Sequence, residues 1–166
     1  MLRAHQVSNL ADRVKVLRQL VWSPIGGLRD PDMRQLGLAV TKGCPARDDM
    51  CELRAIFDFI VSNIRYTGDI TYKDTFTTAL RTLQYGGGDC DDHAELGAVL
   101  IMENGFEAKW KITSNTCATW DHIYLLAGVP KHAPTRWVAL DTTLGTGRFG
   151  TEPRNCKYEI FDVGEQ

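Results

Sequence analysis

The spacing of apolar residues changes at Asn104-Gly105, and this change restricts the possible folds more than any other feature of the chain. Before it, apolar residues recur every third or fourth position, as they do across residues 10–21, which is typical of amphipathic helices. After it, apolar and charged residues alternate over residues 106–112, which predicts a half-buried strand. Helices followed by antiparallel strands predict an α+β domain rather than a wound α/β sheet.

Breaks in the apolar spacing divide the chain into elements. Asp30-Pro31 offers an N-cap followed by proline at the first helical position, and a third helix is predicted to start near Asp48. A short helix is predicted over Thr77–Leu83, and a longer one from Cys90 to the stop at Asn104-Gly105. Three further strands are expected at about His122–Leu126, Arg136–Leu140 and Tyr158–Phe161.

With 166 residues, the chain is long enough for one domain with a full core and too short for two. We predict a single domain over residues 1–166, with a helical extension (1–48) before the core (49–166). The net charge of −2 gives no reason to expect nucleic acid or a membrane as the main partner, and no apolar run approaches a membrane span. The first residues are expected to form an amphipathic helix rather than a signal peptide, which predicts a cytoplasmic protein.

The five cysteines have spacings that match neither a disulfide scaffold nor a zinc site. Cys44 and Cys51 lie seven positions apart without a nearby histidine, so a metal site there is the weaker interpretation. We expect free, partly buried thiols in a reducing cytosol, where a thiol at Cys90 would survive. Neither a metal nor a cofactor is predicted.

One cysteine stands between a glycine loop and the start of a helix, in the run Gly86–His93, which reads GGGDCDDH. At a helix start, the backbone dipole and the unpaired amide groups favour the thiolate, which is the reactive form of cysteine. His122 and Asp141 each lie at the edge of a predicted strand. Cys90, His122 and Asp141 are therefore candidates for a nucleophile, a base and a group that orients the base.

The predicted elements can bring these three side chains together. The strands that carry His122 and Asp141 are joined by a loop of about nine residues, which suits neighbouring strands roughly 5 Å apart. The backbone amide of Cys90 is a candidate oxyanion donor, because amides at a helix start point toward developing negative charge. Gln84, six residues before Cys90, or Tyr85 is a candidate for the second donor.

Other residues near these positions have simpler interpretations. His93, three residues after Cys90, is a rival base on the same helix face, but it lacks an evident orienting partner, so we expect a neutral surface histidine. The three aspartates within residues 89–92 are interpreted as helix-start charge rather than a metal cluster. Because these carboxylates oppose a thiolate, His122 must do more of the activation. Trp120 is expected to line a substrate groove.

Four blocks of the sequence together resemble the transglutaminase-like cysteine peptidase superfamily. The blocks are Gly88–Leu96, Gly105–Lys109, Asp121–Tyr124 and Trp137–Thr143, and the similarity covers roughly residues 50–145. The Gly-Asp-Cys-Asp-Asp form resembles a group that is common in tailed phages and prophages. The resemblance implies a papain-like α+β fold in which Cys90 is the nucleophile, His122 the base and Asp141 the residue that orients the base.

The chain departs from the pattern of this family at two positions. Thr142 stands where proline is usual, and Ile123 follows the histidine where bacterial members often have tryptophan. Trp120 lies on the other side of the histidine instead, so neither departure removes a catalytic group.

These observations predict an enzyme that acts on peptide or amide bonds through a thioester on Cys90. Hydrolysis is the leading expectation, and transglutamination and glutamine deamidation are variants, because water and an amine compete for the same acyl-enzyme. The alternative is a non-catalytic phage particle or assembly protein that uses the fold for binding, but the intact set of three residues favours the enzyme. The expected partner is a protein or peptide substrate, in a host cytoplasm or carried with a virion, and the oligomeric state is left open.

Overall fold

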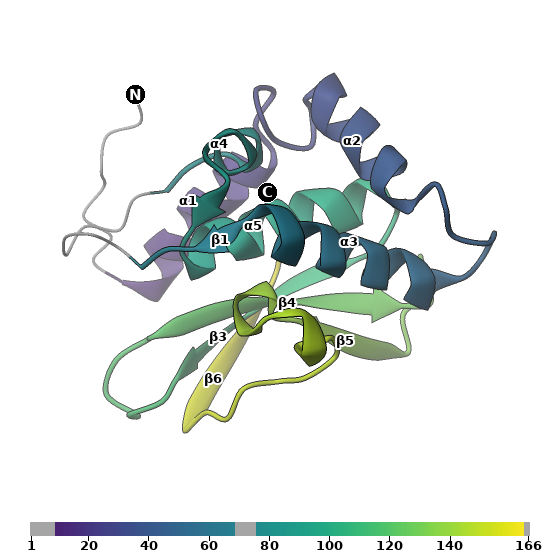
Figure 1. Cartoon of the computed structure of the whole chain (residues 1–166). Helices are drawn as coiled ribbons and strands as arrows, with labels where there is room; N and C mark the ends of the chain where they lie inside the picture. Colours follow the sequence, from purple (N-terminus) through teal and green to yellow (C-terminus); the bar gives the residue numbers. More distant parts are fainter. Residues whose placement is uncertain (1–8, 69–75, 165–166) are drawn as a thin grey trace.

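The computed structural model describes residues 9–68 and 76–164 and shows a layer of helices packed on a four-stranded sheet (Figure 1). The helices are α1 (Leu10–Val21), α2 (Pro31–Thr41), α3 (Asp49–Asn63), α4 (Ala79–Tyr85) and α5 (Cys90–Glu103), with short 3₁₀ helices η1 (Thr142–Leu144) and η2 (Thr146–Arg148). The strands are β1 (Arg65–Tyr66), β2 (Gly87–Gly88), β3 (Ala108–Ser114), β4 (His122–Val129), β5 (Arg136–Leu140) and β6 (Lys157–Asp162). The expected α+β fold is confirmed, and each predicted element lies close to its expected place.

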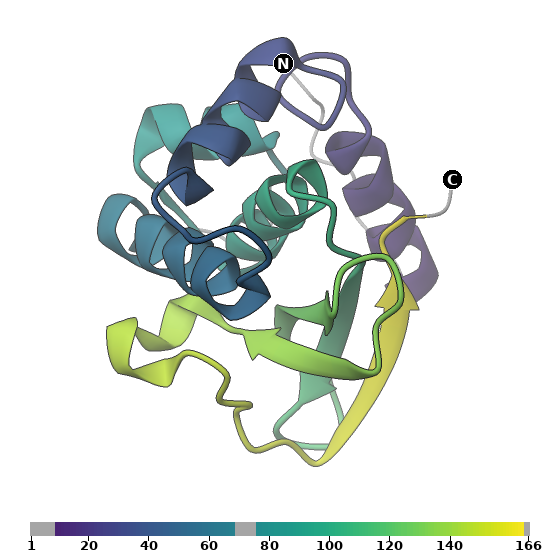
Figure 2. The same cartoon turned by 90° about the vertical axis from the view of Figure 1, so that its right-hand side faces the viewer.

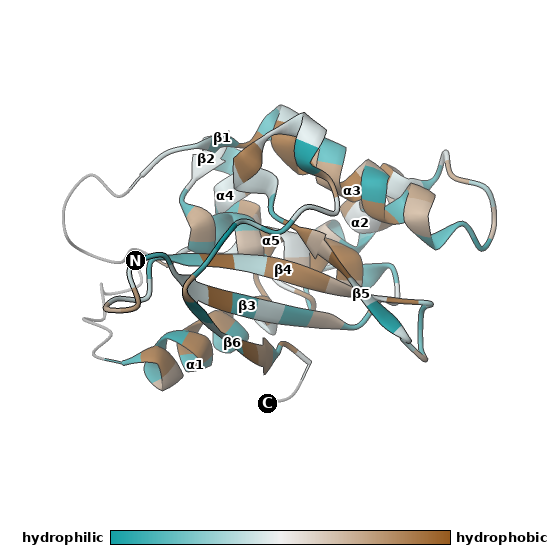
Figure 3. Ribbon diagram, turned by 90° about the horizontal axis from the view of Figure 1, so that it is seen from below, coloured by the Kyte–Doolittle hydropathy of each residue, from teal (hydrophilic) through white to brown (hydrophobic). Residues whose placement is uncertain are grey.

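The main sheet has the strand order β5-β4-β3-β6, and all neighbours in it are antiparallel. Alternate residues of β4 face its two sides. Ile123 and Leu125 face the helices and belong to the main core, whereas Tyr124 packs on the outer face, which Figure 3 shows from below. The Tyr124 hydroxyl donates a hydrogen bond of 2.6 Å to Glu152, so the segment before β6 is bound to this outer face.

Helix α5 lies at the centre of the helical layer, with the other helices around it and the sheet below (Figure 2). Every residue from Cys90 to Ile101 is buried. A helix that is buried on all sides is expected to be apolar. The first turns of α5 nevertheless carry Asp91, Asp92, His93 and Glu95, so these side chains need partners inside the protein.

The main hydrophobic core joins the N-terminal helices to the rest of the molecule. It includes Leu17 from α1, Met33 from α2, Phe57 from α3, Leu100 from α5 and Trp110 from β3, all of which are fully buried. A division at residue 48 therefore does not separate two hydrophobic cores. None of the described helices combines the length and the apolar character that crossing a membrane requires.

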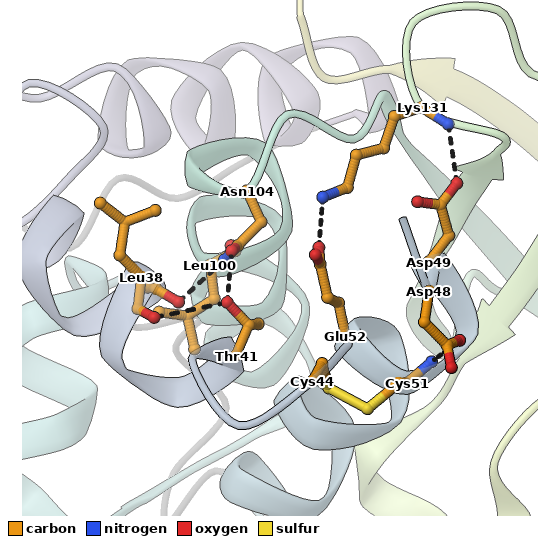
Figure 4. A network of polar contacts seen from close by, with 11 residues as sticks. Leu38, Thr41, Cys44, Asp48, Asp49, Cys51, Glu52, Leu100, Asn104 and Lys131 are labelled. Carbon is orange, nitrogen blue, oxygen red and sulfur yellow. Dashed lines mark hydrogen bonds and ion pairs between the residues drawn. A yellow bond between two sulfur atoms is a disulfide. The ribbon is translucent and has the colours of Figure 1, made fainter. Parts of the chain in front are cut away.

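Two disulfides, Cys44–Cys51 and Cys117–Cys156, contradict the expectation that these four cysteines are free. The first joins the α2–α3 connection to the first turn of α3 (Figure 4), and the second joins the β3–β4 loop to the segment before β6. In each pair the two Cα atoms are 5.7 and 5.4 Å apart, respectively, which is within the range of a disulfide. The pairing could not be predicted from the cysteine spacing, because folding brings the partners together. Cys90 is the remaining thiol. The predicted reducing cytosol rested on free cysteines, so the compartment stays an untested prediction.

Polar contacts fix the end of the helical layer that lies away from Cys90 (Figure 4). The backbone amide of Lys131, in the β4–β5 loop, donates to Asp49 at 3.0 Å, and its ammonium group binds Glu52. Asn104, after the end of α5, accepts a hydrogen bond of 2.7 Å from Thr41 of α2. These contacts attach the β4–β5 loop to α3, and α2 to the end of α5.

Candidate active site

The glycine run 86–88 forms a turn and a short strand that lead into α5. Gly86 ends α4 with φ at 64°, in the left-handed region that favours glycine. Gly87 and Gly88 pair in parallel with β1, an element that the sequence pattern does not predict because it has two residues. A Cβ atom on Gly88 would lie 2.5 Å from the Cβ of Asp92, so only glycine allows this strand to pass so close to α5.

Asp89 caps α5 and thereby fixes Cys90 as the first residue of the helix. Its side chain accepts hydrogen bonds from the backbone amides of Asp91 at 2.9 Å and Asp92 at 3.1 Å. In return, the Asp92 carboxylate accepts a bond of 3.2 Å from the Asp89 amide, which completes a capping box. Burial raises the pKa of Asp92 to about 6, and a hydrogen bond from Thr77 opposes this rise.

The thiol of Cys90 lies against the first residues of β4. β5 pairs with β4 only from Leu125 to Val129, so the start of β4 extends past the end of β5. In this extension the backbone amide of Ile123 lies close enough to the Cys90 sulfur to lower the pKa of the thiol. Ile123 directly follows His122 in β4, and the Cys90 residue is only 8% exposed.

His122 is hydrogen-bonded to Asp141, as the sequence interpretation requires. The distance from His122 Nε2 to Asp141 Oδ2 is 2.6 Å, and the carboxylate is fully buried while the imidazole is 18% exposed. The other carboxylate oxygen accepts bonds from the backbone amide and the hydroxyl of Thr143, at 3.1 and 2.6 Å. Since Nε2 is engaged, Nδ1 is the imidazole nitrogen that can take a proton from a thiol.

The surroundings of Cys90 oppose ionisation of its thiol. Burial, together with the charges of Asp91 and Asp89, raises the pKa of Cys90 from 9.0 to about 12. The charge of Arg13 and the Ile123 amide act in the opposite direction and are smaller. The expectation that the helix start would favour the thiolate is therefore wrong for this environment, mainly because the sulfur is buried. A reactive thiolate at this position would need a proton acceptor beside the sulfur.

Asp91 forms a buried ion pair with Arg13 of α1. The guanidinium group makes three contacts of 2.7–3.0 Å with the two carboxylate oxygens. Each aspartate in the first turn of α5 thus has its own partner, and the described part of the chain contains no cluster of side chains that could hold a metal ion.

His93 is buried, with 3% exposure, which corrects the prediction of a surface histidine. Its Nδ1 lies 2.8 Å from the Thr142 hydroxyl, and burial lowers the pKa of His93 to about 4, so the ring is neutral. The prediction failed because α5 is buried on all sides. His93 is hydrogen-bonded to Thr142, the residue that follows Asp141. This bond holds the turn after Asp141 in place and does not engage the Cys90 thiol.

The remaining predicted site residues are Gln84, Tyr85 and Trp120. Gln84 and Tyr85 are exposed on the last turn of α4, and no hydrogen bond joins either side chain to Cys90 among the described residues. Trp120 is half-buried two residues before His122, and the ammonium group of Lys157 lies 4.4 Å from the centre of its ring. Their roles as oxyanion donor and groove wall stay predictions.

Glu95 is a second feature of α5 that the sequence analysis missed. One carboxyl oxygen accepts a hydrogen bond of 3.2 Å from the Ala79 backbone amide, and the other is buried without a partner among the residues that the structure describes. Burial raises the pKa of Glu95 well above its usual value, because the charged carboxylate is disfavoured away from water. Glu95 lies among apolar residues of the predicted helix, and this pattern could have indicated that it is buried. The sequence does not predict that Glu95 contacts α4.

Sequence comparison identifies a family model that covers most of the site. Residues 34–142 match the model of the transglutaminase-like superfamily, and this range includes Cys90, His122 and Asp141. Helix α1 and strand β6 lie outside it. A search of curated proteins found no match.

Solved structures share the fold at low sequence identity. A proposed cysteine protease from Cytophaga hutchinsonii is 21% identical with a TM-score of 0.58, and the match covers 86% of this chain and 46% of that one. A proposed protease from Parabacteroides distasonis gives 14% and 0.57, over 78% of this chain and 29% of that one. Legionella pneumophila LapG gives 17% and 0.51, over 78% and 70%. The chain spans less than half of the first two proteins, and these similarities show a transglutaminase-like α+β fold.

Proposed function

Because the chain belongs to the transglutaminase-like superfamily, we propose that it is a cysteine peptidase. Cys90 is the nucleophile, His122 the base and Asp141 the residue that orients the base. One observation carries this proposal: a buried carboxylate binds Nε2 of His122 at 2.6 Å, beside the residue whose amide contacts the Cys90 sulfur. An imidazole held in this way keeps Nδ1 for the thiol, and the same arrangement defines nucleophile–base–orienter sites on unrelated folds.

The first half of the reaction forms a thioester. His122 Nδ1 takes the thiol proton, and the Cys90 sulfur attacks the carbonyl carbon of the substrate, which moves an electron pair onto the carbonyl oxygen. The backbone amide of Cys90, at the start of α5, is proposed to donate to this oxyanion. When the carbonyl re-forms, the C–N bond breaks and the imidazolium gives its proton to the leaving amine.

The second half returns the enzyme to its starting state. His122 takes a proton from water, the hydroxyl oxygen attacks the thioester carbon, and the C–S bond breaks as the sulfur regains the proton. With a glutamine side chain as the acyl donor and ammonia as the leaving group, attack by an amine would give transglutamination and attack by water would give deamidation. Hydrolysis of a peptide bond is the proposed main reaction, and the phage origin and the compartment stay predictions.

Labelling with a thiol-directed activity probe, combined with a mixed peptide library, tests this proposal. In the unreduced protein Cys90 is the single thiol, so labelling of the parent reports on this residue without masking the other cysteines. Cleavage of library peptides should require Cys90, and Cys90→Ala should cleave none of them. Cleavage that persists in folded Cys90→Ala would refute the assignment, and incorporation of an amine without cleavage would identify a transglutaminase.

A further inference from the structure

An ion pair joins helix α1 to the helix that carries the proposed nucleophile. Arg13 binds the carboxylate of Asp91, which is the residue directly after Cys90. The side chains of this pair are only 14% and 4% exposed, so the contact is nearly closed to water. α1 and α5 pack side by side, although α1 lies outside the range that matches the family model.

The ion pair controls a charge that acts on the thiol. Asp91 raises the pKa of Cys90 and Arg13 lowers it, because a negative charge disfavours the thiolate and a positive charge favours it. Removal of Arg13 would take away the guanidinium charge that faces this nearly buried carboxylate beside the sulfur. The bidentate geometry also holds the first turn of α5, where the Cys90 amide lies.

We propose that Arg13 is a positioning residue of the active site, which neutralises Asp91 beside the Cys90 thiol, so that helix α1 is part of the catalytic unit. The functional meaning of this role rests on the proposed peptidase activity, but its test measures the thiol and needs no substrate. A purely structural role, in which the pair only attaches α1 to α5, predicts loss of stability without a consistent change in thiol ionisation.

Other charged groups near the thiol are left unchanged by the test. Asp89 also raises the pKa of Cys90, but its side chain is held by the amides of α5. From the sheet side, His122 faces the site with Asp141 bound to it. The variants at Arg13 and Asp91 alter none of these groups.

The experiment measures the rate at which iodoacetamide alkylates Cys90 at fixed pH values between 7 and 9, without reductant. Arg13→Gln should raise the pKa of Cys90 by about 1 and slow alkylation about tenfold, whereas Asp91→Asn should speed it. The double variant should return to within about threefold of the parent, because both charges are gone. Arg13→Lys, which keeps the charge, should restore most of the rate.

Arg18→Gln is the matched control on the same helix. Arg18 bonds to the backbone oxygen of Asp162 in β6, so its loss should leave alkylation of Cys90 unchanged. Equal effects at Arg13 and Arg18, or shifts of the same sign for Arg13→Gln and Asp91→Asn, would overturn the proposal. If Arg13→Gln does not fold, the double variant and Asp91→Asn still decide it. Correct shifts with no peptide cleavage would refute the peptidase but not the role of Arg13.

Discussion

Replacing His122 with alanine should make Cys90 almost unreactive at neutral pH. The structure explains why the effect is large: burial and two aspartates raise the pKa of the Cys90 thiol to about 12. At pH 8 such a thiol is ionised to about one part in 10,000, whereas a thiol at the usual 9.0 is about one-tenth ionised. The environment therefore lowers the thiolate fraction about a thousandfold, and only a proton acceptor at Cys90 can restore reactivity.

The expected result is a loss of at least about 100-fold in the alkylation rate at pH 8, which is within the range for removal of a general base. The rate in His122→Ala should then rise about tenfold per pH unit up to pH 10, because only direct ionisation of the thiol remains. The parent should show a much flatter profile. A small uncharged reagent such as iodoacetamide is suitable, since the Cys90 residue is only 8% exposed.

His132→Ala serves as the control, because His132 is exposed in the β4–β5 loop and takes no part in the site. Its profile should follow that of the parent. If His122→Ala and the parent have the same dependence on pH, then no Cys90–His122 pair forms and the assignment of the base is wrong. A lower rate in both histidine variants would instead indicate a general loss of structure.

Three further results are expected. The free energy of unfolding in urea should fall between pH 5 and 8 in the parent, and Glu95→Gln should reduce this fall. The raised pKa of Glu95 means that the folded parent holds a proton which the unfolded chain releases, so stability falls as pH rises above the unfolded pKa. Replacing Cys117 and Cys156 by serine should cost about 4 kcal/mol of unfolding free energy, and replacing Cys44 and Cys51 by serine about 2 kcal/mol, because the bridges close separations of 39 and 7 residues. Equal losses of unfolding free energy in chemical denaturation would contradict this loop-length argument. Calcium or magnesium should leave the Tm unchanged, because the aspartates beside the thiol already have protein partners, and a rise of several degrees would reveal a metal site.

The three candidate catalytic residues could be recognised from the sequence because local patterns surround each of them. A glycine run and an acidic cap precede Cys90, while His122 and Asp141 lie at the edges of short apolar runs that predict strands. Their order along the chain then matches one family. The local sequence pattern is sufficient to identify a candidate residue when its role depends on the helix or strand that carries it.

Residues whose role depends on a distant partner could not be found in this way. Arg13 and Asp91 are 78 positions apart, and nothing in the spacing of either residue indicates the other. His93 was expected on the surface because it lacked an evident orienting partner, but α5 is enclosed by four helices and the sheet. The same enclosure explains why burial of the Cys90 thiol outweighs the helix dipole.

The Cys117–Cys156 disulfide has a consequence for any study of this protein under reducing conditions. It anchors the loop that ends one residue before His122, and the same reductant that keeps a catalytic thiol from oxidising also opens this anchor. Reductant protects the Cys90 thiol but opens the Cys117–Cys156 disulfide. Activity is therefore expected within a range of redox potential that has both an upper and a lower limit. The molecule should be handled with a redox buffer rather than with excess reductant, and its activity should peak between full oxidation and full reduction.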